Sequence, residues 1–261
     1  MYIGLDIGGY KINGVLMRGN KIVRKRLTLM KSKSDKKIII AQIFDCIEYL
    51  IKEVNKKEIK GIGIGVPGPI DFKKQKILNP PNVTGLKNVF LAKIVREKFK
   101  IKTKIENDAN CFGLAEAVFG AGKSKKIVAG LTLGTGVGGF VIINKKIFRG
   151  KSPRATEFGH KIKIIKNGRK CNCGNRGCLE AYISAKIPVR EKEKYLKIGV
   201  INLVKILDPD IVVIGGGLAN IIALPLIKNT KVVRAKLGEN AGAIGAALLV
   251  KFYPQLIHNK D

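Results

Sequence analysis

Three cysteines and one histidine lie close together in residues 160–178, and their types and spacing could hold a metal ion. The four residues are His160, Cys171, Cys173 and Cys178. Three thiolates and one imidazole complete a tetrahedral zinc shell without an open position for water, which is typical of a structural site. Gly174 and Gly177, between the last two cysteines, permit the tight backbone turns of a metal-binding knuckle. The sequence therefore predicts a structural Zn²⁺ site.

Two other interpretations of these cysteines stay open from the residues alone. They could be ordinary buried packing residues, or they could form disulfides in an exported protein. The first residues have no basic segment followed by a long apolar run, so no signal peptide is expected. No run of about 18 apolar residues is present either, so we expect no membrane span and a cytoplasmic protein with reduced thiols.

Three carboxylates are candidates for binding or catalysis, two beside this cluster and one elsewhere in the chain. Glu157 and Glu180 flank the metal-binding window and would be held still by a bound ion. Asp108 follows an expected strand and opens an expected helix. It could be an N-terminal cap of that helix or a general base that accepts a hydroxyl proton during phosphoryl transfer. Asn107 beside it could hydrogen-bond neighbouring hydroxyl groups.

Glycine-rich loops follow three expected strands and begin at Gly8, Gly134 and Gly215. Such loops let backbone N–H groups approach phosphate oxygens. Two of them, Asp6-x-Gly8-Gly9 and the loop of residues 134–139, could grip a polyphosphate from opposite sides. Asp6, at the end of its strand, suits a magnesium ion or the ion's water ligands, although a turn-capping role is the alternative.

Strands and helices alternate along the chain, which indicates an α/β architecture. Strands are expected at residues 2–7, 11–16, 22–29, 60–66, 102–105, 127–133, 140–144 and 211–214. Helices are expected at residues 35–54, 89–99, 109–119, 198–207 and 240–251. Asp35 can cap the first helix, whose apolar residues follow a 3.6-residue period. With 261 residues and no low-complexity linker, the chain has room for two closely joined lobes.

The charge balance is strongly basic, with 50 Lys and Arg against 19 Asp and Glu and a net charge of +31. A positive field attracts polyanions such as nucleic acid or nucleotide phosphates. The lysines are spread over the whole chain, however, and no nucleic-acid-binding motif accompanies them. We therefore expect no specific nucleic-acid partner and no membrane partner.

Nine motifs together resemble the ROK family (repressors, open reading frames and kinases) of the actin-like ATPase and sugar-kinase superfamily. They lie at residues 6–9, 65–71, 79–82, 106–110, 133–139, 157–160, 171–180, 208–217 and 242–247. The resemblance covers nearly the whole chain and implies a two-lobed ribonuclease-H-like α/β fold with a structural zinc knuckle. The implied lobes are residues 1–112 and residues 113–261, and the last helix could pack back on the first lobe.

The resemblance also implies roles for individual residues. Asp108 would be the catalytic base. A sugar would be bound by Gly68, Asn82, Asn107, Asp108, Glu157, His160 and Glu180. ATP and Mg²⁺ would be held by Asp6, Gly8, Gly9, Lys11, Gly134, Thr135, Gly136, Gly138, Gly216 and Gly217. His160 would bind zinc through one ring nitrogen and face the sugar with the other.

The implied activity is ATP-dependent phosphorylation of a hexose at its 6-hydroxyl, with glucose as the first substrate to expect and glycolysis as its setting. An N-acetylhexosamine or fructose kinase, or a weakly active sugar-binding regulator, is the alternative. The resemblance implies a homodimer. No DNA-binding domain is expected, because the first strand already starts at Tyr2.

The chain departs from the family pattern in a few places. Tyr10 stands where relatives usually have threonine, Phe140 replaces a small residue, and the segment between Glu180 and Asp208 is short. The phenol of Tyr10 must swing away from the phosphates or partly fill their pocket.

Overall fold

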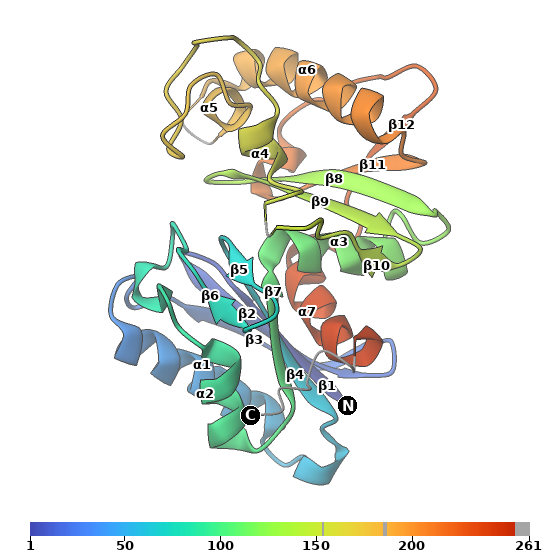
Figure 1. Ribbon diagram of the computed structural model, residues 1–261. Helices are drawn as coiled ribbons and strands as arrows, with labels where there is room; N and C mark the ends of the chain where they lie inside the picture. The colour runs from blue at the N-terminus through green and yellow to red at the C-terminus, as the bar shows by residue number, and fades with distance from the viewer. Residues whose placement is uncertain (153, 185–186, 254–261) are drawn as a thin grey trace. The chain divides into compact units, whose positions relative to one another are not determined.

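The computed structural model describes residues 1–152, 154–184 and 187–253 (Figure 1). The strands are β1 (Tyr2–Ile7), β2 (Lys11–Arg18), β3 (Lys21–Leu29), β4 (Gly61–Val66), β5 (Ile70–Asp71), β6 (Lys76–Ile77), β7 (Thr103–Asn107), β8 (Ile127–Leu133), β9 (Val137–Ile143), β10 (Lys146–Ile147), β11 (Ile211–Gly215) and β12 (Lys231–Arg234). The α-helices are α1 (Lys36–Ile51), α2 (Leu91–Phe99), α3 (Asp108–Val118), α4 (Phe158–Lys161), α5 (Glu180–Ile183), α6 (Val189–Leu207) and α7 (Ala241–Phe252). Short 3₁₀ turns lie at Lys56–Glu58, Thr84–Leu86, Gly217–Asn220 and Gly238–Asn240.

The chain forms two compact units, and the boundary between them falls within α3. The first unit is Met1–Phe112 together with the segment that begins at Asn240, and the second is Gly113–Glu239. This division places α7 with the first unit. Among the described residues, no helix combines the length and the apolar character that crossing a membrane requires.

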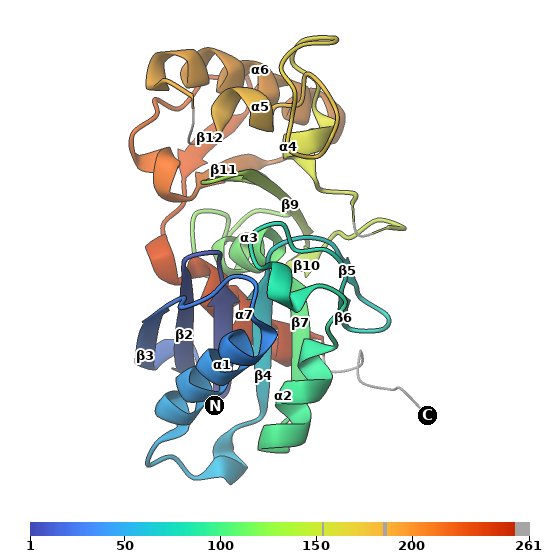
Figure 2. The same ribbon diagram turned by 90° about the vertical axis from the view of Figure 1, so that its left-hand side faces the viewer.

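The first unit is built on a five-stranded sheet with the order β3-β2-β1-β4-β7. Strands β1, β4 and β7 are parallel, and β2 and β3 extend the sheet as antiparallel strands. Helices α1 and α2 cover one face of this sheet and α7 covers the other (Figure 2).

Gly4 of β1 and the glycines of β4 lie on one face of the sheet and large apolar residues on the other, because the two faces have different neighbours. Successive side chains of a strand point to opposite faces, and the isoleucines and leucines of these strands belong to the main apolar core. On the other face α7 approaches closely. A Cβ on Gly4 would lie 1.8 Å from Ala243 O, and one on Gly63 would lie 1.7 Å from Ala246 O. Residues 241–250 of α7 are all buried, as the run of alanines and glycines at its start allows.

The second unit is built on a five-stranded sheet with the order β10-β9-β8-β11-β12. Strands β8, β11 and β12 are parallel, and β9 returns antiparallel to β8. Helices α5 and α6 contribute Tyr182, Ile183, Leu196 and Val200 to the apolar core that they form with this sheet. Helix α6 begins at Val189 rather than at Ile198, because its first turns are largely charged and hide the apolar period.

The glycine-rich segment after β8 is a tighter turn than expected. Residues 137–139 were expected in a loop, but they pair with β8 as the first residues of β9. Gly139 is in contact with a neighbouring segment, since a Cβ there would lie 2.3 Å from Thr156 O. This glycine therefore serves close backbone approach within a strand rather than loop flexibility.

A buried carboxylate ties the end of α3 to the segment before α7 within the second unit. Glu116 is fully buried. Its oxygens accept hydrogen bonds from the backbone N–H groups of Ala121 at 2.8 Å, Lys236 at 2.9 Å and Leu237 at 2.8 Å. A buried carboxylate needs such donors to offset the loss of water.

Candidate functional site

The cysteine segment folds into a compact knuckle that depends on two glycines. Gly174 and Gly177 have φ angles of +87° and +75°, which side-chain-bearing residues rarely adopt. A Cβ on Gly177 would also lie 1.9 Å from Ile165 O. Isolated antiparallel bridges join Lys163 to Cys178 and Lys170 to Arg176. The backbone of the knuckle is therefore shaped by these two glycines and two bridges.

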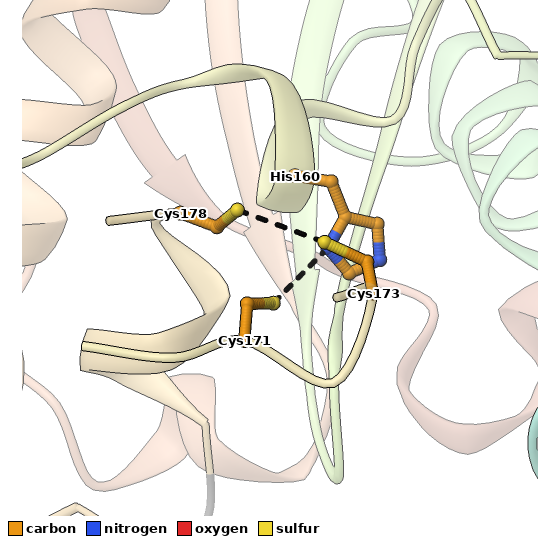
Figure 3. Close-up of side chains that lie close together, drawn as sticks. All are labelled: His160, Cys171, Cys173 and Cys178. Carbon is orange, nitrogen blue, oxygen red and sulfur yellow. Dashed lines mark hydrogen bonds between the residues drawn. The ribbon is translucent and has the colours of Figure 1, made fainter. Parts of the chain in front are cut away.

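The knuckle and α4 bring one nitrogen and three sulfurs together (Figure 3). The potential ligand atoms of His160, Cys171, Cys173 and Cys178 all lie within 4.8 Å of one another. The distance from Cys171 Sγ to His160 Nδ1 is 3.5 Å, and that from Cys173 Sγ to Cys178 Sγ is 3.7 Å. In a tetrahedron with the usual zinc bond lengths, a nitrogen and a sulfur ligand are about 3.5 Å apart, and two sulfur ligands are about 3.8 Å apart. The donor set and its spacing therefore fit a four-coordinate zinc ion.

The two nitrogens of His160 have different neighbours. Nδ1 faces the sulfurs, whereas Nε2 lies 3.9 Å from Glu180 Oε2. The nitrogen that does not face the sulfurs is thus near a carboxylate, at a distance longer than a hydrogen bond.

Glu180 connects the cysteine cluster to the turn after β8. The residue is buried, and its Oε2 accepts a hydrogen bond from Val137 N at 2.9 Å. Its Oε1 lies 3.7 Å from Cys171 Sγ. Gly136 allows this approach, because a Cβ there would lie 2.7 Å from Glu180 Oε2. This contact between the knuckle and the turn was not expected from the sequence.

The thiols of the cluster differ in acidity. Burial raises the pKa of Cys171 to about 12. Burial also acts to raise the pKa of Cys173, but hydrogen bonds from Asn175 and the neighbouring thiols outweigh it and the pKa falls to about 7. Lys163 donates to Cys178 Sγ at 3.0 Å, and this hydrogen bond raises the pKa of the lysine. The exposed Cys173 is therefore more readily ionised than Cys171.

In the first unit, Asp108 is not the cap of α3. That role belongs to Asn107, whose Oδ1 accepts a hydrogen bond from Asn110 N at 3.2 Å. The Asn107 amide also donates to Gly68 O at 3.4 Å. Asp108 Oδ1 accepts a local hydrogen bond from Ala109 N at 2.9 Å, and burial raises the pKa of the Asp108 carboxyl. Its carboxylate is thus placed to accept a proton.

Asp6 lies at the carboxyl end of β1, and Asp108 follows the carboxyl end of β7, two strands away in the same sheet. Burial, and after it the negative charge of Asp108, raise the pKa of Asp6 to about 7, while Lys11 acts to lower it. The start of α7 lies beside Asp6, since a Cβ on Gly242 would come within 2.3 Å of Asp6 Oδ2. Two acidic groups therefore share the edge of the sheet where α/β proteins bind ligands.

The glycine loops also gather at strand ends within each unit. In the first unit, Gly8 N donates to Lys11 O at 2.9 Å, and a Cβ on Gly9 would lie 3.0 Å from Asn82 Cβ. In the second unit, Gly134 N donates to Gly136 O at 3.0 Å. Gly216, with a φ of +86°, lies against the end of β8, since a Cβ there would lie 2.3 Å from Leu133 O.

The remaining expected site residues have the following places. Thr135 is exposed in the turn after β8, Gly138 lies in β9, and Gly217 begins a 3₁₀ turn. Glu157 precedes α4, and its carbonyl accepts the His160 N–H at 3.0 Å. Tyr10 is 64 % exposed, with Lys33 Nζ 3.7 Å from its ring centroid. The phenol is thus held at the surface by a lysine.

Sequence reasoning missed one residue that positions the Asn107 region. Glu106 is buried on β7, and its Oε1 accepts hydrogen bonds from Asn107 N at 2.9 Å and Asn110 Nδ2 at 3.0 Å. The position of a glutamate inside a short strand does not reveal which groups it will hydrogen-bond, because these partners come into place only when α3 forms.

Comparisons with known proteins agree with this architecture. The model of the ROK family matches residues 2–187. The xylose repressor of Bacillus subtilis (strain 168) is 31% identical over 95% of this chain and 76% of its own length. The glucokinase of Thermotoga maritima is 30% identical over 95% of this chain and 96% of its own length. The structure of a ROK family glucokinase from Streptomyces griseus in complex with glucose and AMPPNP superposes with a TM-score of 0.82 and 26% identity, covering 96% of this chain and 99% of that one.

These matches confirm the expected α/β fold of the actin-like ATPase and sugar-kinase superfamily. They also show relatives of two kinds, sugar kinases and a repressor. The chain belongs to the ROK family.

Proposed function

We propose that this chain is an ATP-dependent sugar kinase that phosphorylates the 6-hydroxyl of a hexose, with glucose as the first candidate. The observation that carries the proposal is the position of the Asp108 carboxylate and its raised pKa. Asp108 opens α3, yet Asn107 performs the capping, so the Asp108 carboxylate is available for a proton. Its raised pKa makes it a better proton acceptor than an ordinary aspartate.

In the proposed reaction Asp108 takes the proton of the sugar hydroxyl as that oxygen attacks the γ-phosphorus of ATP, and ADP leaves. Most of the catalytic effect in such transfers comes from positioning and from stabilising charge on the phosphoryl oxygens. Asp6 would hold Mg²⁺ or its water ligands, and Lys11 with the backbone N–H groups of Gly8 and Gly9 would meet the phosphates. Gly134, Thr135, Gly136 and Gly138 would serve the same nucleotide, with Gly216 and Gly217 near its adenosine.

The sugar would be bound by Gly68, Asn82, Asn107, Glu157, His160 and Glu180. The cysteine cluster would hold a Zn²⁺ ion through His160 Nδ1 and the three sulfurs. Zinc with four protein ligands supplies rigidity rather than chemistry. Its proposed role is to fix His160 and Glu180, and the position of Glu180 beside both His160 and Cys171 supports this role. A thiolate centre of this kind favours a reducing compartment, so we also propose a cytoplasmic location.

The test is the replacement Asp108→Asn, assayed as sugar-dependent ADP release from ATP. Loss of a general base usually lowers turnover 10²- to 10⁴-fold, and we expect a loss of that size with little change in the KM for sugar. Asp45→Asn is the matched control, because Asp45 is an exposed carboxylate on α1. Wild-type turnover should also fall as the pH drops through the raised pKa of Asp108, because only the ionised carboxylate accepts a proton.

The substrate is tested with a panel of glucose, fructose, N-acetylmannosamine and N-acetylglucosamine, each with ATP or polyphosphate as donor. 6-Deoxyglucose should compete with glucose without being phosphorylated, which checks the position of transfer. Turnover of Asp108→Asn within tenfold of wild type would show that Asp108 is not the base. Sugar binding by calorimetry without turnover with any donor would favour the sugar-responsive regulator instead.

A further inference from the structure

The lysine beside the cysteine cluster is placed by the backbone register. Ile164 N donates to Gly177 O at 2.8 Å, and Leu179 N donates to Ile162 O at 2.9 Å. These two bonds flank the facing pair of Lys163 and Cys178 and leave it as a non-hydrogen-bonded pair of an antiparallel bridge. The side chains of such a pair lie on one face and closer together than those of a hydrogen-bonded pair.

The side chains of this pair are in direct contact. Lys163 Nζ lies 3.0 Å from Cys178 Sγ and 3.1 Å from Arg176 O. Cys178 is 0% exposed, whereas Lys163 is an exposed residue. The lysine therefore brings a positive charge from the surface to a buried sulfur. Asn175 also donates to a cluster sulfur, but its Nδ2 is 3.5 Å from the exposed Cys173 Sγ and carries no charge.

The charge of a zinc centre explains what this contact could do. Zn²⁺ with three thiolates and a neutral imidazole carries one net negative charge, which is costly at a buried sulfur. An ammonium group that donates to one thiolate balances that charge. A hydrogen bond to a ligand sulfur also withdraws electron density from it, which lowers the tendency of the sulfur to take up a proton or react with an oxidant. Partners of metal ligands typically change metal affinity 10- to 100-fold when they are removed.

We propose that Lys163 is a positioning residue of the metal centre, which neutralises the zinc–thiolate charge through Cys178 and so secures retention of the metal. This inference rests on the proposed zinc site and adds to it a residue that does not itself bind the ion. Lys163 is expected to affect metal affinity and the reactivity of the thiolates.

The experiment uses the full chain loaded with zinc and compares Lys163→Met with Lys161→Met. Methionine keeps an unbranched apolar stem and removes the charge. Lys161 is the matched control, because it is an exposed lysine next to His160 in the sequence and loses the same charge. Zinc content is measured by elemental analysis, and affinity is measured by competition with a chromophoric chelator. Far-UV circular dichroism with excess zinc verifies that each variant is folded.

Wild type should contain one zinc per chain. Lys163→Met should bind zinc roughly 10- to 100-fold more weakly and release it faster in hydrogen peroxide, whereas Lys161→Met should stay within about threefold of wild type. Lys163→Arg should recover part of the affinity, because a guanidinium also donates to sulfur.

Cobalt provides a second readout that a purely structural role would not change. In the Co²⁺-loaded chain, loss of the hydrogen bond should move the sulfur-to-cobalt charge-transfer band to longer wavelength in Lys163→Met alone. Equal affinities and spectra for wild type and Lys163→Met would overturn the role of Lys163 and leave the zinc site intact. A wild-type chain that folds and binds no zinc would overturn both.

Discussion

Replacing Asp6 by asparagine should stabilise the folded chain, and the gain should grow as the pH rises. Burial and the neighbouring Asp108 raise the pKa of Asp6 to about 7, against about 3.9 in an unfolded chain. The folded state thus holds a proton on Asp6 between about pH 4 and pH 7 that the unfolded state has released. Stability must therefore fall as the pH rises through this range, and the loss is complete above pH 7.

The difference between the two pKa values of Asp6 sets the largest stabilisation that its replacement can give. One pKa unit corresponds to about 1.4 kcal/mol, so an ionised Asp6 costs the folded state at most about 4 kcal/mol at pH 8 and about 1.5 kcal/mol at pH 5. Asparagine has nearly the same shape and no charge. Asp6→Asn should therefore gain up to these amounts, and near pH 3 it should gain almost nothing.

The assay is urea denaturation at pH 3, 5 and 8 in magnesium-free buffer, because a bound cation would ionise Asp6. The chain has no tryptophan, so unfolding is followed by far-UV circular dichroism. Glu53→Gln is the control, since Glu53 is exposed and its replacement raises the net charge by the same amount. If Asp6→Asn is less stable than wild type at pH 8, or its gain is no larger at pH 8 than at pH 5, the reasoning about Asp6 is refuted.

Two further predictions concern packing within the units. Glu116→Ala removes the acceptor of three backbone N–H groups and should lower the free energy of unfolding by roughly 3 kcal/mol or more; Glu116→Gln, which keeps one acceptor oxygen, should lose less, and a change below about 1 kcal/mol in urea denaturation would contradict this role. Gly63→Ala places a methyl group 1.7 Å from Ala246 O and should cost roughly 3 kcal/mol or more, or prevent folding. Gly217→Ala is its control, because the new methyl meets nothing within 4 Å, and similar urea midpoints for the two alanine variants would argue against close packing of α7.

The elements with strong local signals could be predicted from the sequence. Helix α1 is one of them, since its apolar period agrees with its cap: Asp35 Oδ1 accepts hydrogen bonds from Lys37 N at 2.8 Å and Ile38 N at 3.1 Å. The sequence predicts that strand β9 begins at Phe140 rather than at Val137, because Gly138 and Gly139 are typical of a loop. Only the pairing with β8 and the close approach of Thr156 make them strand residues.

The candidate site was likewise predictable from the sequence only in part. The four potential metal ligands follow from residue type and spacing, because closely spaced cysteines with a histidine are typical zinc ligands. The contact of Lys163 with Cys178 depends on the register of a bridge across the knuckle. Lysine is common throughout this chain, so no composition or motif distinguishes Lys163 from its exposed neighbours.

Glu180 shows why a structural ion could matter for a reaction in which it takes no chemical part. One carboxylate oxygen is 2.9 Å from Val137 N, at the start of β9, and the other is 3.7 Å from Cys171 Sγ. A carboxylate has about four lone-pair sites, so Glu180 can hold this N–H group and still accept a sugar hydroxyl. Its neighbours are the cysteine cluster on one side and the turn after β8 on the other, and the hydrogen bond from Val137 N orients it. We expect a shift of the cluster on loss of the metal to move Glu180, which is hydrogen-bonded to the turn, and this is the role proposed for the zinc ion in the proposed kinase.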